Sequence, residues 1–153
     1  MPDKLSHLDD RGRVQMVDVS AKMPMRRTAV AEGFLHAAES TLELLEVGEL
    51  PKGEALAAAR IAGIQAAKRC GELIPLCHPL SLDDVRVSFE RVDLTRLRIE
   101  TQVTTTARTG VEMEALLAVS VAALTLYDMA KAVDKNMAIE GVHLVSKTKE
   151  EAT

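Results

Sequence analysis

The chain has 153 residues, 47% of them hydrophobic and 27% charged, a composition typical of one folded domain and not of a disordered chain. A formal net charge of -4 argues against general nucleic-acid binding, and an aromatic content of 2% argues against a base-stacking surface. The first residues lack the apolar stretch of a signal peptide, and no run approaches the roughly 20 apolar residues of a membrane span. We therefore expect a cytoplasmic protein with free thiols at Cys70 and Cys77.

The first half of the chain predicts two strands and two helices. Residues 14–19 alternate as a short strand, and residues 26–37, whose apolar pattern fits either helix or strand, are taken as a second strand. Residues 40–47 indicate a short helix entered through a Ser or Thr cap. The Ala-rich residues 52–73 have the helix propensity of a first long helix.

The second half predicts a hairpin, a helix and a strand. Residues 85–103 alternate between apolar and polar side chains on both sides of a turn, which indicates a hairpin with one solvated face. Residues 109–135 indicate a second long helix, so apolar in its middle that we expect burial on all sides. Residues 137–145 alternate as a closing strand, with Gly141 a candidate bulge.

The order of these elements is typical of an α+β fold of the ferredoxin-like type. Its β-α-β-β-α-β succession places two long helices on one face of an antiparallel sheet, here preceded by short N-terminal elements. We expect a flexible N-terminal segment at 1–12, a single ferredoxin-like domain at 13–148 and a C-terminal tail at 149–153.

The first candidate for chemistry is His78, which lies in an apolar loop. Pro75 and Pro79 bracket it, exclude helix there and hold the imidazole in a fixed environment. The alternative is a buried histidine bonded to backbone carbonyls. Cys77 is adjacent, but neighbouring residues make a poor ligand pair and no C-x-x-C spacing occurs, so we expect no metal site.

Further candidates lie at the two ends of the second long helix. Thr109 and Glu112 match a capping box, so Glu112 is assigned a structural role. Glu114 faces about 200° around the helix from Glu112 and is the better functional candidate, with a buried ion pair as the alternative. Asp128 and Lys131 are three residues apart, which predicts either a routine ion pair or an acid/base pair.

Several basic residues could serve an anionic ligand, although each is weak evidence alone. Lys52 precedes the first long helix, where a lysine is usually a solvated charge, and further cations are Lys22, Arg26, Arg60, Lys68 and Arg69. Glu114 and Asp128 are 14 residues apart, about 21 Å along a helix, which is too far for one small reacting centre. A site that uses both needs a long ligand or two subunits. We therefore predict an oligomer with sites across its interface.

Five motifs in chain order resemble the cyclic pyranopterin monophosphate synthases of molybdenum cofactor biosynthesis. The resemblance covers about residues 5 to 147. The motifs are residues 16–22 (MVDVSAK), 52–54 (KGE) with 59–68 (ARIAGIQAAK), 73–80 (LIPLCHPL), 109–116 (TGVEMEAL) and 127–131 (YDMAK). Two small departures are Glu54, where we expect Asp, and Ala130, where Cys is common.

The resemblance implies a ferredoxin-like fold and a hexamer, a trimer of dimers, with active sites at the dimer interface. It implies a phosphorus-oxygen lyase that converts 3',8-cyclo-7,8-dihydroguanosine 5'-triphosphate to cyclic pyranopterin monophosphate and releases pyrophosphate. Carried onto this sequence, the catalytic residues would be Lys52, His78, Asp128 and Lys131. The substrate-binding residues would be Leu76, Cys77, His78, Met113 and Glu114. No cofactor is required by the sequence, which leaves open whether magnesium accompanies the triphosphate.

Two other classes of function fit the same topology. One is a non-catalytic nucleotide-binding regulatory module, because a fold does not fix a function. The other is an RNA-recognition domain, which needs aromatic side chains on its central strands, where only Phe89 is available. The acidic charge and the lack of aromatics argue against the second.

Overall fold

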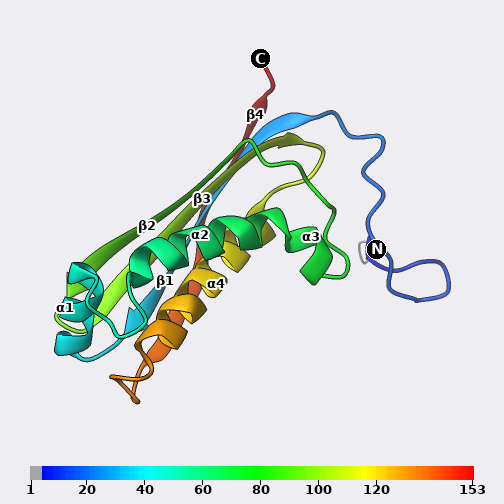
Figure 1. Cartoon of the computed structure of the whole chain (residues 1–153). Coiled ribbons are helices and arrows are strands. Elements are labelled where there is room, and N and C mark those ends of the chain that lie inside the picture. Colours follow the sequence, from blue (N-terminus) through cyan, green and yellow to red (C-terminus); the bar gives the residue numbers. More distant parts are fainter. Residues whose placement is uncertain (1–4) are drawn as a thin grey trace.

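The computed structural model describes residues 5–153 and shows a two-layer α+β fold (Figure 1). The start of the expected flexible segment, residues 1–4, lies outside the described residues. The elements in chain order are β1 (Met25–His36), α1 (Glu39–Val47), α2 (Ala55–Lys68), α3 (Cys70–Leu73), β2 (Asp84–Asp93), β3 (Arg96–Ala107), α4 (Glu112–Ala130) and β4 (Ala138–Glu151).

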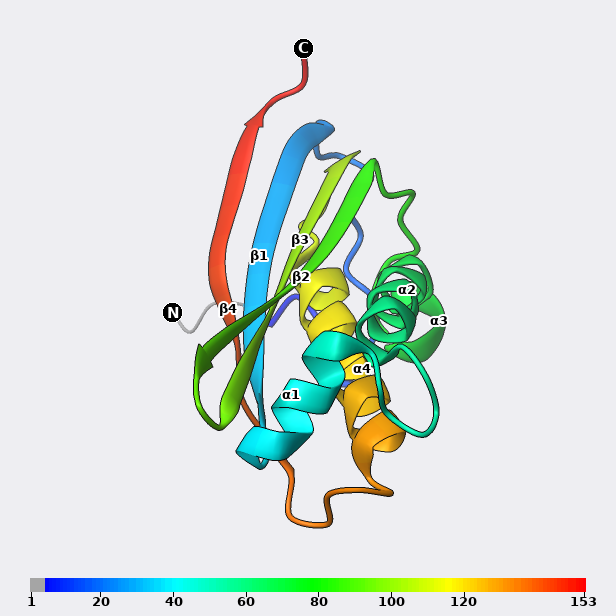
Figure 2. The ribbon, with the colours of Figure 1, turned by 60° about the vertical axis from the view of Figure 1, so that its left-hand side comes forward.

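The four strands form one antiparallel sheet in the order β2-β3-β1-β4. The helices lie together on one face of this sheet, with α4 nearest the central strands (Figure 2). This is the arrangement that the sequence predicts for a ferredoxin-like fold, so the predicted fold class is confirmed.

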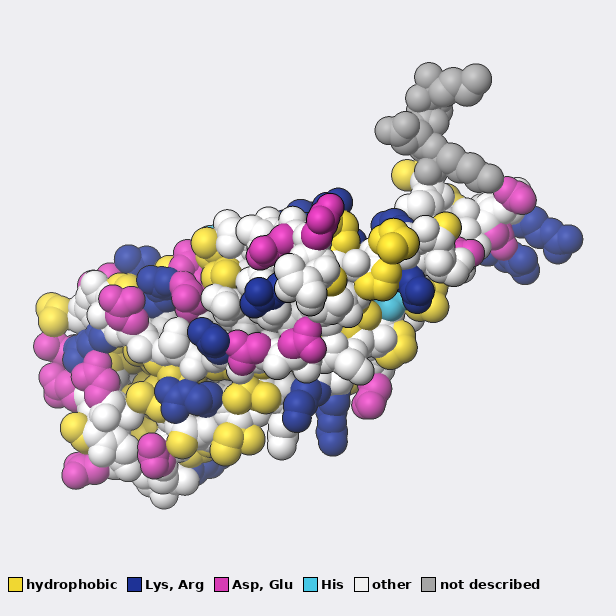
Figure 3. All heavy atoms as spheres, turned by 90° about the horizontal axis from the view of Figure 1, so that it is seen from above, with side chains coloured by type: hydrophobic (Ala, Val, Ile, Leu, Met, Phe, Trp, Pro, Cys, Tyr) yellow, Lys and Arg dark blue, Asp and Glu magenta, His cyan; other side chains and the backbone are white. Residues whose placement is uncertain are grey.

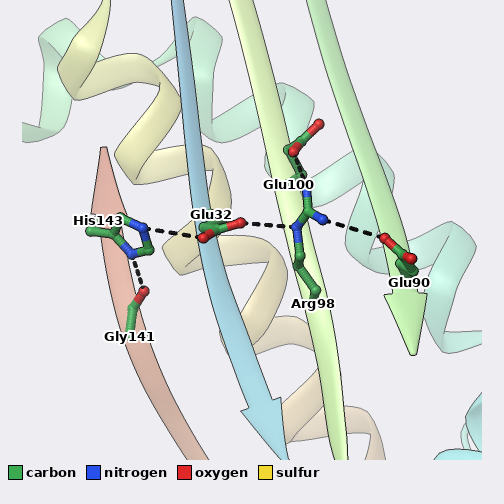
Figure 4. Close-up of polar contacts among 6 residues, drawn as sticks. All are labelled: Glu32, Glu90, Arg98, Glu100, Gly141 and His143. Carbon is green, nitrogen blue, oxygen red and sulfur yellow. Dashed lines mark hydrogen bonds and ion pairs between the residues drawn. The ribbon is translucent and has the colours of Figure 1, made fainter. Parts of the chain in front are cut away.

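The other face of the sheet is solvated, as the alternation in the hairpin predicts. Because side chains alternate along a strand, every second residue of β1 and β3 faces away from the helices, and several of these residues are charged. Glu32 forms ion pairs with Arg98 Nε at 2.9 Å and with His143 Nε2 at 3.2 Å. Arg98 also pairs with Glu90 and Glu100, so one network crosses all four strands (Figure 4).

The predicted strand at residues 14–19 is wrong. Between residues 5 and 24 the structure has only an isolated bridge between Leu8 and Val14, and Val14 is 68% exposed. In the structure these residues pair with no strand of the sheet, although β2 and β4 each have one unpaired edge. Instead this segment runs past the loop that carries His78 and is tied to it by a hydrogen bond from His78 to the Val17 carbonyl.

The other predicted elements are present with different limits. The first long helix is divided at Arg69 into α2 and α3, and the second spans Glu112–Ala130 and not residues 109–135. The last strand continues to Glu151, and the pairing of β1 with β4 shifts opposite Gly141, whose φ is +63°, so the predicted bulge is confirmed.

The predicted Ser or Thr cap of α1 is also wrong. Its N-cap is Ala38, which offers no side-chain cap, and the Asp134 carboxylate from the loop before β4 takes that role. Asp134 Oδ2 accepts hydrogen bonds from the Ala38 amide and the Thr41 hydroxyl, each at 2.9 Å. The Asp134 carboxylate satisfies the backbone amide just before α1 and the Thr41 hydroxyl in its first turn, and it also joins the two loops at this end of the fold.

The core depends on the close approach of α2 to α4. Small side chains line the contact, and a Cβ added to Gly63 would lie 3.1 Å from the carbonyl oxygen of Ala118. Ala118 and Ala122 of α4 are fully buried beneath α2 and the sheet. Leu124 is 59% exposed, however, so the prediction that α4 is buried on all sides is wrong for the single chain.

Among the described residues, α4 is the one helix long and apolar enough to pass a length-and-composition test for a membrane span. Its packing against α2, β1 and β3 is that of a core helix. In the face seen in Figure 3, basic and acidic side chains are interspersed and do not form a patch of one sign.

The α2–α4 contact predicts the effect of a larger side chain at position 63. Gly63→Val should lower the free energy of unfolding by about 1–3 kcal/mol, because overpacking forces the two helices apart. The measurement is urea unfolding followed by circular dichroism. Gln65→Val, on the exposed side of the same helix, is the matched control. Equal effects of the two substitutions would contradict the close contact.

The Asp134 cap predicts a pH-dependent contribution to stability. Its hydrogen bond from the Ala38 amide holds the pKa of Asp134 below its usual value. Asp134→Ala should therefore cost about 2 kcal/mol at neutral pH. The difference from the unsubstituted protein should shrink as pH falls below about 4, where the unfolded chain takes up the proton. Asp84→Ala, which removes an exposed ion pair with Arg86, should cost little at any pH.

Candidate active site

The sequence-predicted residues lie in two clusters, one at each end of α4. The α4-start cluster is Leu76, Cys77, His78, Met113 and Glu114. The α4-end cluster is Lys52, Asp128 and Lys131. The 14 residues between Glu114 and Asp128 span about 21 Å of helix, so the structure brings the members of each cluster together but keeps the two clusters apart.

The loop after α3 orients His78 toward the N-terminal segment. Pro75 and Pro79 prevent this loop from continuing the helix, and a Cβ on Gly71 would lie 2.8 Å from Pro79, so the loop folds back tightly on α3. His78 Nε2 donates a hydrogen bond of 2.7 Å to the Val17 carbonyl oxygen. A carbonyl can only accept, so Nε2 carries the proton and Nδ1 of a neutral ring is left as an acceptor. His78 therefore forms the hydrogen bond to a backbone carbonyl that the sequence analysis gave as the alternative to a functional role. It also lies at the edge of a hollow.

That hollow, of about 340 Å³, is lined by Leu76, Cys77, His78, Met113 and Lys22, together with residues of the N-terminal segment. A second hollow of about 280 Å³ shares Gly110 and Glu112 with it. Its other walls include Arg27, Lys147 and Lys149 of β1 and β4. A hollow with mixed polar and apolar walls beside a basic hollow suits a ligand with a heterocycle at one end and phosphates at the other.

Glu112 does not form the predicted capping box. The N-cap of α4 is Val111 and has no side-chain cap hydrogen bond. Glu112 Oε1 instead forms an ion pair of 3.2 Å with Lys147 of β4. Glu112 therefore keeps a structural role, but it ties α4 to Lys147 of β4 and does not cap its own helix.

Glu114 is 1% exposed and lies behind Cys77. The Cys77 thiol donates to Glu114 Oε1 at 3.6 Å, and Glu114 Oε2 is buried without a hydrogen-bond partner. Burial raises the pKa of this carboxyl group above its usual value. The sequence analysis gave a buried ion pair as the alternative role of Glu114. Among the described residues no basic side chain pairs with Glu114, so it is a buried carboxyl group without a cation.

Lys52 reaches the other end of α4 through a tight turn. Gly53 donates its amide to the Leu50 carbonyl at 2.9 Å, and Pro51 follows Leu50 in that turn. Gly53 has φ +102°, a value that other residues rarely adopt, and it turns the chain directly into α2. Lys52 Nζ then lies 3.0 Å from Asp128 Oδ2 and 3.2 Å from the Asp128 carbonyl.

Asp128 is held between two ammonium groups. Lys131 Nζ lies 2.9 Å from Asp128 Oδ1, on the side opposite Lys52. The hydrogen bond and charge of Lys131, followed by those of Lys52, lower the pKa of Asp128 from its usual value. All three side chains are about half exposed in the single chain, at 44–56%. The carboxylate is therefore ionised at neutral pH and accepts hydrogen bonds from both lysines.

Residues 16–150 match the MoaC family. The chain belongs to the MoaC family. The relatives include the cyclic pyranopterin monophosphate synthases of Herpetosiphon aurantiacus, 57% identical over 94% of this chain and 88% of that one, and of Heliobacterium modesticaldum, 54% identical over 95% and 92%. The synthase of Roseiflexus castenholzii is 55% identical over 94% of this chain and 92% of its own.

Within this MoaC chain the remaining predicted cations have different surroundings. Lys22 lines the larger hollow, whereas Arg60 donates to the Val87 carbonyl at 3.1 Å and packs over Phe89. Arg26, Lys68 and Arg69 are exposed and line neither of the two hollows at the start of α4.

The basic hollow contains residues that the sequence analysis missed. Arg27 lies opposite Lys149 in the pairing of β1 with β4, and Lys147 lies opposite Ala29. The only sequence signal was the spacing of two between the lysines, which places both on one face of a strand. Their approach to Arg27 depends on the strand register.

The α4-end cluster predicts how its lysines affect Asp128. Lys131→Gln should raise the pKa of Asp128 toward its usual range, and Lys52→Gln should raise it less, because Lys131 has the larger effect. Carboxyl-carbon NMR titration measures this directly. Lys135→Gln is the control, since Lys135 Nζ donates to the Lys131 carbonyl and does not contact Asp128. An unchanged pKa of Asp128 in the Lys131→Gln variant would contradict the ion pair between Asp128 and Lys131.

Proposed function

We propose that this protein is a cyclic pyranopterin monophosphate synthase of molybdenum cofactor biosynthesis. It converts 3',8-cyclo-7,8-dihydroguanosine 5'-triphosphate to cyclic pyranopterin monophosphate and releases pyrophosphate. The membership of the MoaC family and the names of its relatives support this activity. The observation that carries it furthest is the ionised Asp128 between Lys52 and Lys131.

The α4-end cluster supplies proton transfer in this proposal. Rearrangement of the purine to a pterin requires a base and an acid near each other, and Asp128 and Lys131 are 2.9 Å apart. The two ammonium groups also stabilise negative charge as a ribose oxygen attacks the innermost phosphate. Expulsion of pyrophosphate by this attack makes the enzyme a phosphorus-oxygen lyase.

The α4-start cluster binds the substrate in this proposal and also contains the catalytic residue His78. The apolar walls of the larger hollow accept the heterocycle, and Arg27, Lys147 and Lys149 offer charge to the phosphates. His78 Nδ1 is the acceptor nitrogen available to a ligand, because Nε2 is engaged by Val17. No further cofactor is part of this proposal, and magnesium would enter only with the triphosphate.

We further propose that two copies of the chain share each site, within a hexamer built as a trimer of dimers. One site needs His78 and Lys131 together, and about 20 Å of helix separates the clusters that contain them. The exposed Leu124 and Ile61, on the outward sides of α4 and α2, are apolar surface that another subunit would cover. We place the enzyme in the cytoplasm, where its nucleotide-derived substrate is made.

The activity is tested by incubating the purified protein with the cyclised nucleotide and measuring pterin and pyrophosphate. Asp128→Ala and Lys131→Ala should each lose at least about 100-fold in turnover, the usual contribution of a proton-transferring group. Lys135→Ala, an exposed lysine on the next turn, should retain activity. Nucleotide binding without any product would instead indicate a regulatory module.

The shared site is tested by mixing two inactive variants. When His78→Ala and Lys131→Ala chains are co-expressed, half of the dimers are mixed and each mixed dimer has one intact site. Turnover should then recover to about a quarter of that of the unsubstituted protein, if sites lie across a two-fold interface. Activity no higher than that of either parent would place each site within one chain.

A further inference from the structure

Cys70, Cys77 and Glu114 form a compact cluster of metal-ligand atoms, which we call the thiol–carboxylate cluster. Cys70 begins α3, Cys77 lies in the following loop, and Glu114 is in the first turn of α4. The two sulfurs are 3.8 Å apart, Cys77 Sγ is 3.6 Å from Glu114 Oε1, and all three ligand atoms lie within 4.8 Å of one another.

The distance between the two sulfurs and the distance from Cys77 Sγ to Glu114 Oε1 match those of a tetrahedral zinc site. With Zn–S bonds of about 2.3 Å and Zn–O bonds of about 2.0 Å, ligand atoms at tetrahedral angles are separated by about 3.8 Å for two sulfurs and about 3.5 Å for sulfur and oxygen. A disulfide would need the sulfurs at about 2.05 Å. Both thiols are free, so the fold holds three donors at metal-ligand distance with little rearrangement required.

An unsatisfied acceptor gives an independent indication of a ligand. Glu114 is 1% exposed, and its Oε2 has no hydrogen-bond partner. Buried polar atoms are nearly always bonded, so each exception requires an explanation. Among the described residues no lysine or arginine forms an ion pair with Glu114, and a cation bound by both carboxylate oxygens would give Oε2 its missing partner.

The cluster is accessible from the larger hollow. Cys70 is buried, but Cys77 is partly exposed and lines the hollow next to His78 and Met113. A metal ion can therefore enter on that side and keep a water as its fourth ligand. Binding of the metal would release the thiol protons of Cys70 and Cys77.

We propose that Cys70, Cys77 and Glu114 bind one zinc ion per chain, and that bound zinc blocks the hollow that receives the substrate. The second half of this proposal rests on the proposed function, because Cys77 and Glu114 are there substrate-binding residues. The first half depends only on the three ligands. Zinc is favoured over magnesium or calcium because two of the three ligand atoms are sulfur.

Cobalt(II) is the spectroscopic probe for the site. Titration of the reduced protein with cobalt should produce a thiolate-to-cobalt charge-transfer band in the near ultraviolet that saturates at one ion per chain and disappears when zinc is added. Cys70→Ser, of similar size, should weaken zinc binding by more than the roughly 100-fold that the loss of an outer-shell partner costs. Glu112→Gln, a neighbouring carboxylate that is not a ligand, should leave the band unchanged. Absence of the band in the unsubstituted protein, shown by circular dichroism to be folded, would overturn the site.

The blocking effect is tested by turnover of the cyclised nucleotide. Stoichiometric zinc should abolish turnover by the unsubstituted protein, and a chelator should restore it. Cys70→Ser, which changes no residue assigned to the substrate, should remain active at the same zinc concentration. Zinc binding with undiminished turnover would overturn the blocking effect alone. A protein that shows the cobalt band but has no turnover even after chelation would contradict the proposed function and leave the metal site standing.

Discussion

The close contact between α2 and α4 is the constraint on which the rest of the structure depends. Gly63 has no room for a larger side chain beside the backbone of Ala118, and the small residues around it let α4 lie flat between α2 and the sheet. A helix held in this way cannot shift along its axis without losing that fit. Both of its ends are therefore fixed points, and each end carries one group of functional side chains.

The two ends offer different chemical environments because they differ in burial. At the start of α4, Glu114 is enclosed and has no cation, so its carboxyl pKa is raised and the site favours neutral groups or a bound metal. At the other end Asp128 is exposed and has two ammonium partners, which lower its pKa and keep it ionised. The start of α4 is therefore enclosed and borders the basic hollow, whereas its end carries an exposed, charged cluster.

The sequence predicted the fold class and most elements because their signals are local. Alternation marked the hairpin, the Ala-rich run marked α2, and the spacing of Asp128 and Lys131 marked their ion pair. The errors concern partners from elsewhere in the chain. Asp134 caps α1, Lys147 takes the place of the expected capping box at Glu112, and residues 14–19 find no strand to pair with. Such partners are set by topology, which no local pattern contains.

In the proposed oligomer one substrate molecule contacts the start of α4 in one subunit and the end of α4 in another. The decisive measurement is a crystal structure of the oligomer with an unreactive analogue of the cyclised nucleotide. His78 of one subunit and Lys131 of its neighbour should both contact the same ligand. A ligand whose contacts all come from a single subunit would contradict it.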